Sequence, residues 1–536
     1  MIRLSQVKLP ISHSREELEQ KAAKALKISP GQIKGLQITK QSIDARKRDQ
    51  VTYSYVLDIQ AEQEEKIIKR AKNRNAVIKK ETSYRFPSCG KQPLSAPPVI
   101  IGTGPAGLFC GLMLARAGYR PILLERGGPV EERKEKVDTF WNENKLDPQC
   151  NVQFGEGGAG TFSDGKLNTL VKDISGRNGE VLRIFTEFGA DPSICYVNKP
   201  HIGTDVLSEI VSRIRKEIIR LGGQVRFHAC VTDFLIQEET DGGRAITGVL
   251  VNHTEKIESS AVVLAIGHSA RDTFQALYEQ QIPMEPKAFA VGLRIQHPQE
   301  MIDESQYGRE AAGILGAASY KLTYQAGNGR GVYTFCMCPG GYVVNASSEE
   351  GHLAVNGMSN HARDGENANS AVIVTVTPED FGGNDKDPLA GVEFQRRLEE
   401  KAFKLGQGLI PVQLYGDFKE DRESGGFGGV NPQFCGKVRF ANLRTLLPED
   451  VTLAMVEGID RFGQIIKGFD RPDGILAGIE SRTSSPIRIP RNEEAESPVR
   501  GLYPCGEGAG YAGGITSAAM DGIRTAECLA KRFRPF

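Results

Sequence analysis

The chain has 536 residues, of which 39% are hydrophobic and 25% charged, and its formal net charge is zero. This composition is ordinary for a globular protein, and the length predicts two to four domains. The longest apolar run, residues 99–117, is broken by glycines and contains Arg116, which argues against a membrane helix. The N-terminus lacks a signal-peptide core, and the ten cysteines have no framework spacing, so we expect reduced thiols and a cytoplasmic protein.

Residues 1–95 are predicted to form a separate basic α+β module. They contain 20 lysines and arginines against 10 aspartates and glutamates, so the rest of the chain carries an equal acidic excess. A helix capped by Ser14 and Glu17 and a later charged helix are expected beside three strands, at residues 2–9, 36–45 and 51–60. A basic surface can bind nucleic acid or an acidic protein. The alternative is a solvated surface that docks against the acidic remainder, since the sequence contains no nucleic-acid-binding motif.

A glycine-rich turn follows the apolar run VII that starts at Val99, which is typical of a buried parallel strand. The turn has the G-x-G-x-x-G spacing. Gly102 permits the sharp turn, Gly104 lets the backbone approach a pyrophosphate, and Gly107 lets the next helix pack closely. Pro105 and Ala106 begin that helix. Its N-terminus is predicted to hold the phosphates of a dinucleotide.

The next predicted strand, residues 121–124, ends in Glu125 and Arg126. Glu125 comes about 20 residues after the turn, where an acidic side chain accepts hydrogen bonds from the adenosine ribose. A carboxylate there disfavours a 2′-phosphate, so the spacing indicates FAD or NAD rather than NADP. We assign Arg126 to the same cofactor site. The alternative is a structural βαβ unit without a ligand.

A second glycine-rich segment, GEGGAGTFSDGK at residues 155–166, is predicted to line the pyrophosphate or the flavin ring with its backbone N–H groups. Its candidate cofactor-binding residues are Gly157, Gly158, Ala159, Gly160 and Lys166. Lys166 is expected to neutralise phosphate charge or the reduced flavin. A flexible surface loop is the alternative.

Two later segments resemble those of flavoproteins built like glutathione reductase. The strand AVVLAIG at residues 261–267 is similar to the one that passes the adenine, which implies that Ala265 and Gly267 contact the cofactor. Near the C-terminus, Gly506 and Glu507 resemble the Gly-Asp pair that binds the ribityl chain, with Glu in place of Asp. The helix that begins after Gly514, at Ile515, is expected to direct its N-terminus at the flavin pyrimidine edge. Together these segments imply FAD.

Between these segments the chain is predicted to leave the cofactor domain. Runs such as FAVGLRI and AVIVTV indicate a β-rich substrate domain with a helix at residues 393–404. A linker rich in Pro, Ser and Gly is expected at residues 83–98. The fold class is therefore α/β, with a Rossmann-like FAD-binding domain and its parallel sheet split by a β-rich inserted domain, plus the N-terminal α+β module. The expected boundaries are 1–95 for the module, 96–282 and 475–536 for the two parts of the FAD-binding domain, and 283–474 for the insertion.

Four motifs extend the resemblance over nearly the whole chain: QFGEGGAGTFSDGKL at 153–167, YTFCMCPGG at 333–341, NGMSNHARDGENANSA at 356–371 and GIESRTSSPIRIP at 478–490. They resemble a bacterial family of FAD-dependent dehydrogenases, labelled NAD(FAD)-utilising dehydrogenases. The resemblance implies a flavin oxidoreductase of the glutathione-reductase-type FAD-binding superfamily but names no substrate.

Cys336 and Cys338 form a C-x-C motif, which suggests a thiol pair that exchanges electrons with the flavin. A C-x-C disulfide closes a short, strained ring, and strained disulfides are oxidising and labile. The alternative is that both cysteines are small apolar side chains in a buried strand. The sequence shows no metal-ligand spacing, so we expect no zinc or iron–sulfur site.

Candidate acid–base and anion-binding groups lie close to the predicted domain junctions. Arg294 and Arg482 are the preferred groups for a substrate carboxylate, and His268 is a candidate acid or base. Three further candidates are Arg271, His297 and Arg488. Each of these histidines and arginines could instead serve a structural hydrogen bond or ion pair.

The sequence as a whole predicts an FAD-dependent oxidoreductase that transfers hydride between flavin N5 and an organic substrate or NAD(P)H. Only one full dinucleotide fingerprint is present, so any pyridine nucleotide is expected to bind transiently. Two other hypotheses remain open. One is an RNA-modifying flavoprotein that holds tRNA through the basic module. The other is a non-catalytic FAD-binding redox sensor.

Overall fold

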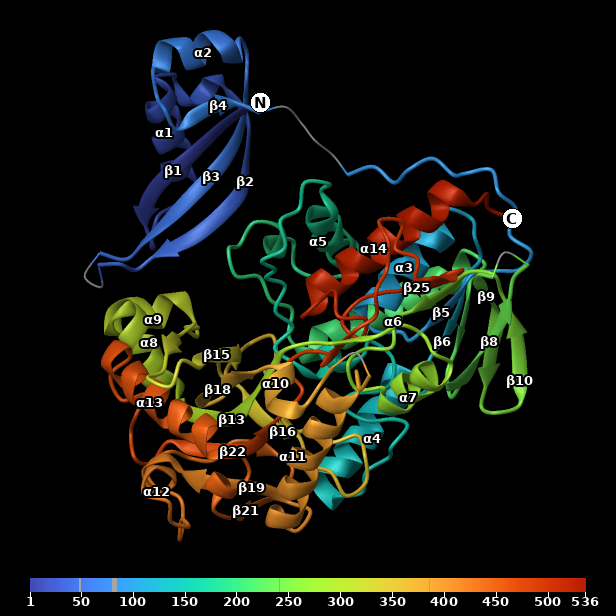
Figure 1. Ribbon diagram of the computed structural model, residues 1–536. Coiled ribbons are helices and arrows are strands. Elements are labelled where there is room, and N and C mark those ends of the chain that lie inside the picture. The colour runs from blue at the N-terminus through green and yellow to red at the C-terminus, as the bar shows by residue number, and fades with distance from the viewer. Residues whose placement is uncertain (48–49, 80–83, 241, 385) are drawn as a thin grey trace.

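The computed structural model describes residues 1–47, 50–79, 84–240, 242–384 and 386–536. The structure has three regions: a small N-terminal module, a domain built on a parallel sheet, and a large domain built on a mixed sheet (Figure 1). This is the α/β architecture that the sequence predicts, with a Rossmann-like sheet whose chain is split by an insertion. Within the described residues no helix is long and apolar enough to cross a bilayer.

The N-terminal module is a four-stranded sheet of order β2-β3-β1-β4 with two helices. Its elements are β1 (Ile2–Pro10), α1 (Arg15–Leu26), β2 (Ile33–Asp44), β3 (Thr52–Ala61), α2 (Glu64–Ala71) and β4 (Ala76–Ile78). The expected capping box is confirmed, because the Ser14 side chain accepts from Glu17 N and the Glu17 carboxylate accepts from Ser14 N. The module has its own apolar core.

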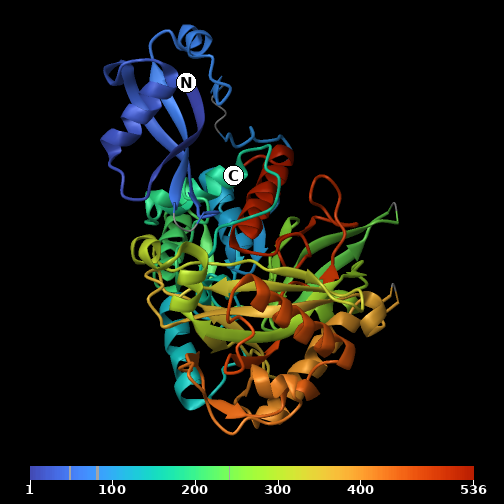
Figure 2. The same ribbon diagram turned by 90° about the vertical axis from the view of Figure 1, so that its left-hand side faces the viewer.

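The module touches the body of the molecule at the edge strand β2 (Figure 2). Gln41 N donates to the Tyr196 carbonyl at 2.7 Å, and Asn198 N donates to the Gln41 carbonyl at 2.8 Å. The chain then runs without helix or strand from residue 84 to residue 98, as the linker prediction requires. Ser83, where that linker was expected to start, lies outside the described residues.

The central domain contains a five-stranded parallel sheet of order β25-β11-β5-β6-β7. Its strands are β5 (Val99–Ile101), β6 (Ile122–Leu124), β7 (Gln224–Arg226), β11 (Val262–Leu264) and β25 (Leu502–Pro504). Side chains alternate between the two faces, as in any strand. Ile100, Leu123 and Val263 pack against helices, whereas Val99, Leu124 and Val262 pack on the other side.

Helices from distant parts of the chain cover the first face of this sheet. They are α3 (Pro105–Arg116), α5 (Arg177–Glu187), α6 (Thr204–Arg220) and α14 (Ile515–Arg532). The C-terminal α14 lies directly beside α3 (Figure 1), where a Cβ on Gly522 would meet the Ala106 carbonyl at 2.1 Å. This close approach brings the ends of the FAD-binding domain together.

A second, smaller sheet covers the other face. It comprises β8 (Val231–Glu238), β9 (Arg244–Val251), β10 (Glu255–Glu258) and β24 (Val499–Arg500), with α7 (Arg271–Glu279) alongside. The short pair β12 (Glu285–Pro286) and β23 (Ile487–Arg488) follows at the passage into the inserted domain.

The inserted domain is built on a seven-stranded sheet of order β14-β15-β18-β13-β22-β19-β21. Its strands are β13 (Phe289–Pro298), β14 (Thr323–Gln325), β15 (Gly331–Cys338), β18 (Asn367–Val376), β19 (Ile410–Leu414), β21 (Val438–Phe440) and β22 (Ile475–Glu480). A smaller sheet adds β16 (Tyr342–Asn345), β17 (Val355–Met358) and β20 (Phe434–Cys435). The domain's helices are α8 (Gln299–Tyr307), α9 (Arg309–Leu315), α10 (Pro378–Phe381), α11 (Ala390–Gly406), α12 (Tyr415–Lys419) and α13 (Glu449–Ile465).

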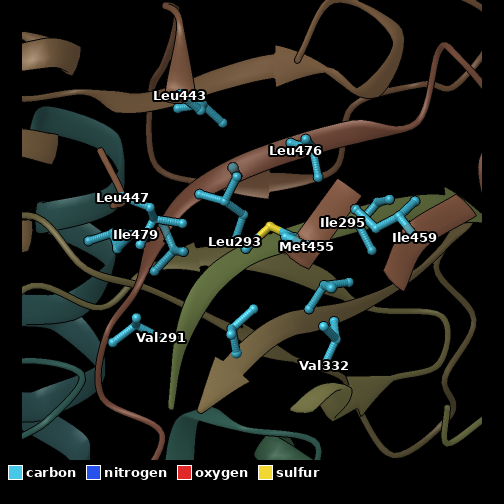
Figure 3. Packing of buried hydrophobic residues seen from close by; sticks show 14 of the residues in the cluster. Val291, Leu293, Ile295, Val332, Leu443, Leu447, Met455, Ile459, Leu476 and Ile479 are labelled. Carbon is cyan, nitrogen blue, oxygen red and sulfur yellow. The ribbon is translucent and has the colours of Figure 1, made fainter. Parts of the chain in front are cut away.

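Strand β22 corrects the expected boundary at residue 475. It lies in the inserted sheet between β13 and β19, so the chain returns to the FAD-binding domain only after Glu480. Figure 3 shows the reason: Leu476 and Ile479 belong to the same apolar cluster as Leu293 of β13 and Met455 of α13. Burial in that cluster stabilises β22 in the inserted sheet.

The two large domains also meet through α4 (Val130–Glu143). Trp141 Nε1 donates to the Asn345 carbonyl at 2.9 Å, and the Trp141 ring packs edge-on against Phe162. Val137 and Val344 are buried in the same cluster. This contact fixes the inserted domain beside the loop at residues 155–166.

Candidate active site

A cavity of about 340 Å³ lies where the two large domains meet. One wall comes from the parallel-sheet domain: the turn after β5, the start of α3, the loop at 153–166, the end of β11 and the start of α14. The inserted domain supplies the opposite wall, with Phe335, Cys336, Asn356, Glu480 and Arg482. A volume of this size is typical of a small-molecule or cofactor site.

The glycines of the fingerprint act as the sequence predicts. Gly102 has φ +97°, and a Cβ there would lie 2.4 Å from the Ala265 carbonyl. A Cβ on Gly107 would lie 2.0 Å from the Gly102 carbonyl, so only glycine lets α3 pack this close to the turn. Gly104 is the N-cap of α3 and has no side-chain cap. Gly102, Gly104, Pro105 and Ala106 line the cavity, whereas Gly107 faces the turn.

Glu125 lines the cavity but differs from the expected ribose acceptor. Its Oε2 accepts from Thr103 N at 2.9 Å and Thr103 Oγ1 at 2.8 Å. Its Oε1 accepts from Gly127 N at 3.1 Å and Gly155 N at 2.9 Å. Four donors fill the acceptor positions of a carboxylate. In this structure Glu125 therefore joins the fingerprint turn to the loop that begins at Gly155.

Arg126 also lines the cavity. Its guanidinium makes a bidentate pair with Asp272 at 2.8–2.9 Å and lies 4.4 Å from the centre of the Phe154 ring. Its charge is therefore partly balanced by Asp272. It contributes position and planar stacking surface rather than an unpaired charge.

The loop at 155–166 is held from below by Arg133 of α4, which the sequence analysis did not select. Arg133 is fully buried, and burial lowers its pKa to about 10. Its guanidinium donates to backbone carbonyls of Asn151, Val152, Gly155, Glu156 and Gly158. This contact could not be predicted from sequence spacing, because its partners are backbone carbonyl groups, which every residue has.

The loop places Gly158, Ala159, Gly160 and Lys166 at the cavity, as predicted. Gly157, which was predicted to bind the cofactor, does not line the cavity. Its Cα faces Thr161 and Val211, and its N–H donates to the Thr103 carbonyl at 2.9 Å. The left-handed φ of +85° at Gly157 makes this turn possible.

Lys166 forms an ion pair with Asp164, Nζ to Oδ2 at 3.0 Å. Arg363 also pairs with Asp164, through its Nε at 2.8 Å. Burial raises the pKa of Asp164, but Lys166 and Arg363 outweigh it and hold that pKa below its usual value. Two cations share one carboxylate here, so this side of the cavity is positively charged.

The N-terminus of α14 opens into the cavity through Gly514 and Ile515. A Cβ on Gly513 or Gly514 would meet no atom within 4 Å among the described residues. Glu507 lines the cavity as well. Gly506 was also predicted to bind the cofactor, but it lies behind the cavity wall against Ala106 and donates its N–H to Asp521 at 2.8 Å. Ala265 and Gly267 line the cavity at the end of β11, as predicted.

These features fit FAD. Two helices, α3 and α14, direct N-termini without acidic first turns at one cavity, and such termini bind the anionic parts of a cofactor. Glycine backbone lines the path between them, and Lys166 adds positive charge. In addition, Nε2 of His268 is buried without a hydrogen-bond partner among the described residues and lines the same cavity.

On the other wall, the structure does not support the predicted role of Arg294 in binding a substrate carboxylate. It is fully buried and does not line the cavity. Its Nε donates to Glu480 at 2.8 Å, and its other N–H groups donate to Asn369, Asn356 and the Cys336 carbonyl. With its donors engaged, Arg294 cannot bind a substrate carboxylate. It positions the groups that do line the wall.

Glu480 and Asn356 are cavity residues that the sequence analysis missed. Burial raises the pKa of Glu480, and the Arg294 guanidinium opposes this shift only in part. Glu480 lies in the GIESRTSSPIRIP motif, which was the available signal. Its pairing with Arg294, 186 positions away, could not be read from local spacing.

Arg482 lines the cavity, as expected for a substrate-binding arginine, but its N–H groups already donate to other side chains. It donates to both oxygens of Glu399 at 2.7–2.9 Å, and also to Ser269 and Ser348. Arg271 binds the same carboxylate from the other side, at 2.7–2.8 Å. This buried cluster joins α7, α11 and the segment after β22.

The structure places the remaining candidate residues in different surroundings, some at the cavity and some away from it. His268 lies at the cavity with its Nδ1 3.4 Å from Glu507 Oε1. His297 is fully buried, and its Nε2 is 2.7 Å from the Phe469 carbonyl, which is a structural role. Arg488 stacks on Tyr511 with its guanidinium 4.5 Å from the ring centre and does not line the cavity. Cys336 lines it, whereas Cys338 lies buried behind it.

A protein of Clostridium beijerinckii is 47% identical to this chain over 537 residues, covering 99% of each. The chain belongs to the family of this clostridial protein. Residues 288–483 match the family described as FAD-dependent protein, C-terminal domain-like, and residues 1–60 match a domain of unknown function (DUF8436). The first match covers the inserted domain through β22 and Arg482. The family match and the cavity together assign FAD as the cofactor.

Several solved structures show distant similarity. L-proline dehydrogenase from P. horikoshii is 13% identical, with 81% of this chain and 93% of that chain covered and a TM-score of 0.34. A variant of the halogenase PltM in complex with FAD is 10% identical, with 80% and 67% covered and a TM-score of 0.35. CtdE in complex with FAD is 13% identical, with 81% and 82% covered and a TM-score of 0.28.

Proposed function

We propose that this protein is an FAD-dependent oxidoreductase that moves a hydride between the flavin and a small organic substrate, with NAD(P)H as a transient electron donor. One observation carries the proposal: a single cavity joins the FAD-binding segments to a wall of polar and ionisable groups from the inserted domain. When bound, FAD supplies two-electron chemistry at its N5. A binding module without catalysis would have no need of the second wall.

The chain's own charges favour acceptance of electrons. The N-terminus of α14 and the Lys166 ammonium place positive potential on one side of the cavity. A helix N-terminus stabilises a nearby negative charge by about 0.3–2 kcal/mol. Electron transfer to a flavin adds negative charge, so these groups favour the reduced state.

Proton movement is assigned to His268 and Glu480. His268 Nε2 has no partner among the described residues, and its Nδ1 faces Glu507 at 3.4 Å, which orients the ring. Glu480 has its pKa raised by burial, so it holds a proton more readily than an exposed glutamate. Arg482 lines the same wall, but its guanidinium is held by Glu399, Ser269 and Ser348, so it shapes the wall rather than binding a substrate carboxylate. The ten free cysteines support a reducing compartment, which we propose is the cytoplasm.

The test is anaerobic reduction of the purified, flavin-loaded protein by NADH, NADPH and a panel of small hydroxy acids and amino acids. We expect loss of the oxidised-flavin absorbance with at least one reductant. We also expect the rate to fall roughly a hundredfold or more in His268→Asn, the range for loss of a general acid or base. The matched control is His253→Asn, which changes an exposed histidine in the turn between β9 and β10. A flavin that none of these reductants reduces would instead support the redox-sensor hypothesis.

A further inference from the structure

The C-x-C motif lies on a β-bulge at the end of β15. Phe335 pairs with Ala371 and Cys338 pairs with Asn369, so three steps along β15 match two steps along β18. A bulge of this kind places two consecutive side chains on one face of a strand. Phe335 and Cys336 accordingly both line the cavity.

The backbone at Cys336 is held in an uncommon conformation. Its φ is +42°, in the left-handed region that residues other than glycine rarely adopt. Arg294 Nη1 donates to the Cys336 carbonyl at 3.1 Å, and Cys338 Sγ donates to the same carbonyl at 3.2 Å. A cysteine that served only as apolar filling would not require this arrangement, and Cys336 is not part of the inserted domain's core cluster, although its neighbour Met337 is.

The surroundings of the two thiols shift their pKa values in opposite directions. The neighbouring Cys338 thiol lowers the pKa of Cys336, with help from Arg294 and Lys166 and against the effect of burial. Burial raises the pKa of Cys338 well above its usual value. Asp164 and Glu480 are the acidic groups that face the pair, and each is bound to one of these cations. These surroundings favour the thiolate form of Cys336 and the protonated form of Cys338.

We propose that Cys336 and Cys338 are a redox-active dithiol that exchanges two electrons with the flavin across the cavity. Oxidation of the dithiol forms one S–S bond between the two Sγ atoms and releases two electrons, together with the Cys338 proton when Cys336 is the thiolate. The electrons pass to the flavin with a proton, and the reverse transfer opens the disulfide. This step rests on the proposed function, because it uses the same flavin.

The direction follows from ring size. A disulfide between residues two apart is strained, and strained disulfides are the more easily reduced ones. The reduced flavin is thus the electron donor, and a dithiol is the product. A small disulfide is the class of substrate that such a dithiol reduces: the Cys336 thiolate attacks one of its sulfur atoms and releases the first thiolate. Cys338 then gives its proton to the first released thiolate and attacks the Cys336 sulfur, which forms the Cys336–Cys338 disulfide and releases the second thiolate.

Thiol reactivity tests the pair without the flavin reaction. Purified full-length protein is labelled briefly with iodoacetamide between pH 4 and pH 9, and peptides are quantified by mass spectrometry. We expect Cys336 to reach half its maximal labelling rate at a pH well below that of the exposed Cys89 and Cys195. Cys338→Ala should move the Cys336 midpoint upward, because it removes the thiol donor. Labelling of Cys336 that only follows Cys89 would overturn the proposal.

A reductive titration tests electron exchange. Protein treated with diamide and then freed of oxidant should contain a Cys336–Cys338 peptide lighter by two hydrogen atoms. Its anaerobic titration should consume twice as many reducing equivalents per flavin as Cys336→Ser or Cys338→Ser. The matched control Cys435→Ser, on β20 away from the cavity lining, should titrate like the wild type.

The two proposals fail in different ways. Equal consumption in the wild type and the Cys338→Ser variant would reject the dithiol, and reduction of the flavin by NAD(P)H in both would leave the proposed function standing. A reactive, disulfide-forming pair beside a flavin that accepts no electrons from any reductant would reject both the exchange and the proposed oxidoreductase.

Discussion

Charged side chains buried without solvent contact decide how the cavity is shaped. Arg133 and Arg294 are both fully buried, and neither touches the cavity. Each is surrounded by acceptors, because burying an unpaired charge costs several kcal/mol. Arg133 shapes the cofactor side through backbone carbonyls, and Arg294 shapes the opposite wall through Glu480 and Cys336.

Arg133→Met should loosen the loop at 155–166, because five buried carbonyls lose their donor. We expect a loss of roughly 3–5 kcal/mol of stability, the range for breaking a buried charged network. We also expect a lower fraction of protein purified with FAD. Chemical denaturation and the ratio of flavin to protein absorbance measure the two effects.

Arg220→Met is the matched control, since Arg220 lies exposed on α6 and pairs only with Glu217. It should change stability by less than about 0.5 kcal/mol, as exposed substitutions do. An Arg133→Met protein as stable and as yellow as this control would show that Arg133 does not hold the loop.

At the scale of elements, two helix N-termini separated by some 400 residues in sequence meet at one cavity. The first of them, at α3, is open because Gly104 carries no side chain. Gly104 has φ −67°, which any residue adopts, and a Cβ there would lie 3.8 Å from Gly158 Cα. Small side chains are therefore compatible with the fold at this position.

Gly104→Val should separate cofactor binding from folding. The added methyl groups enter the space between α3 and the loop, so FAD affinity should fall roughly tenfold or more, which is at least 1.4 kcal/mol. The melting temperature of the flavin-free protein should stay within a few degrees of the wild type. Flavin titration followed by fluorescence gives the affinity.

Gly179→Ala on α5 serves as the comparison, because a Cβ there meets nothing within 4 Å among the described residues. It should bind FAD like the wild type. Unchanged FAD affinity in Gly104→Val would contradict the placement of the pyrophosphate at α3.

Local chemistry explains which elements could be predicted from the sequence. The strand at Val99, the glycine turn and the Ser14 cap depend on residues within a few positions of one another. Strand β22 and the Arg294–Glu480 pair depend on partners far along the chain, which a single sequence does not reveal. The same holds for Glu125, whose Oε1 accepts from the backbone N–H of Gly155, 30 positions away.

At the scale of the whole molecule, the N-terminal module is attached lightly. It has its own core, and its folded part, residues 1–79, contacts the body through backbone hydrogen bonds of Gln41 with Tyr196 and Asn198. None of its residues lines the cavity. Its basic excess makes tRNA or an acidic protein its proposed partner, alongside simple docking on the acidic body.

Removal of residues 1–79 should leave FAD bound with an unchanged absorption spectrum and an unchanged rate of reduction. If the module holds tRNA, the full chain should bind tRNA with an affinity that falls steeply with salt, and the shortened chain should not. Filter binding and the flavin spectrum report on the two properties. Loss of FAD on truncation would show that the module supports the cavity.

The central position of β22 also sets the order of events on the ribosome. Until residues 475–480 have been synthesised, β19 and β21 have no link to the rest of their sheet. The final parallel strand β25 and the helix α14 emerge only a few dozen residues later. Both sheets are therefore completed by strands within residues 475–504, and the part of the cavity wall formed by α14 follows them in the chain.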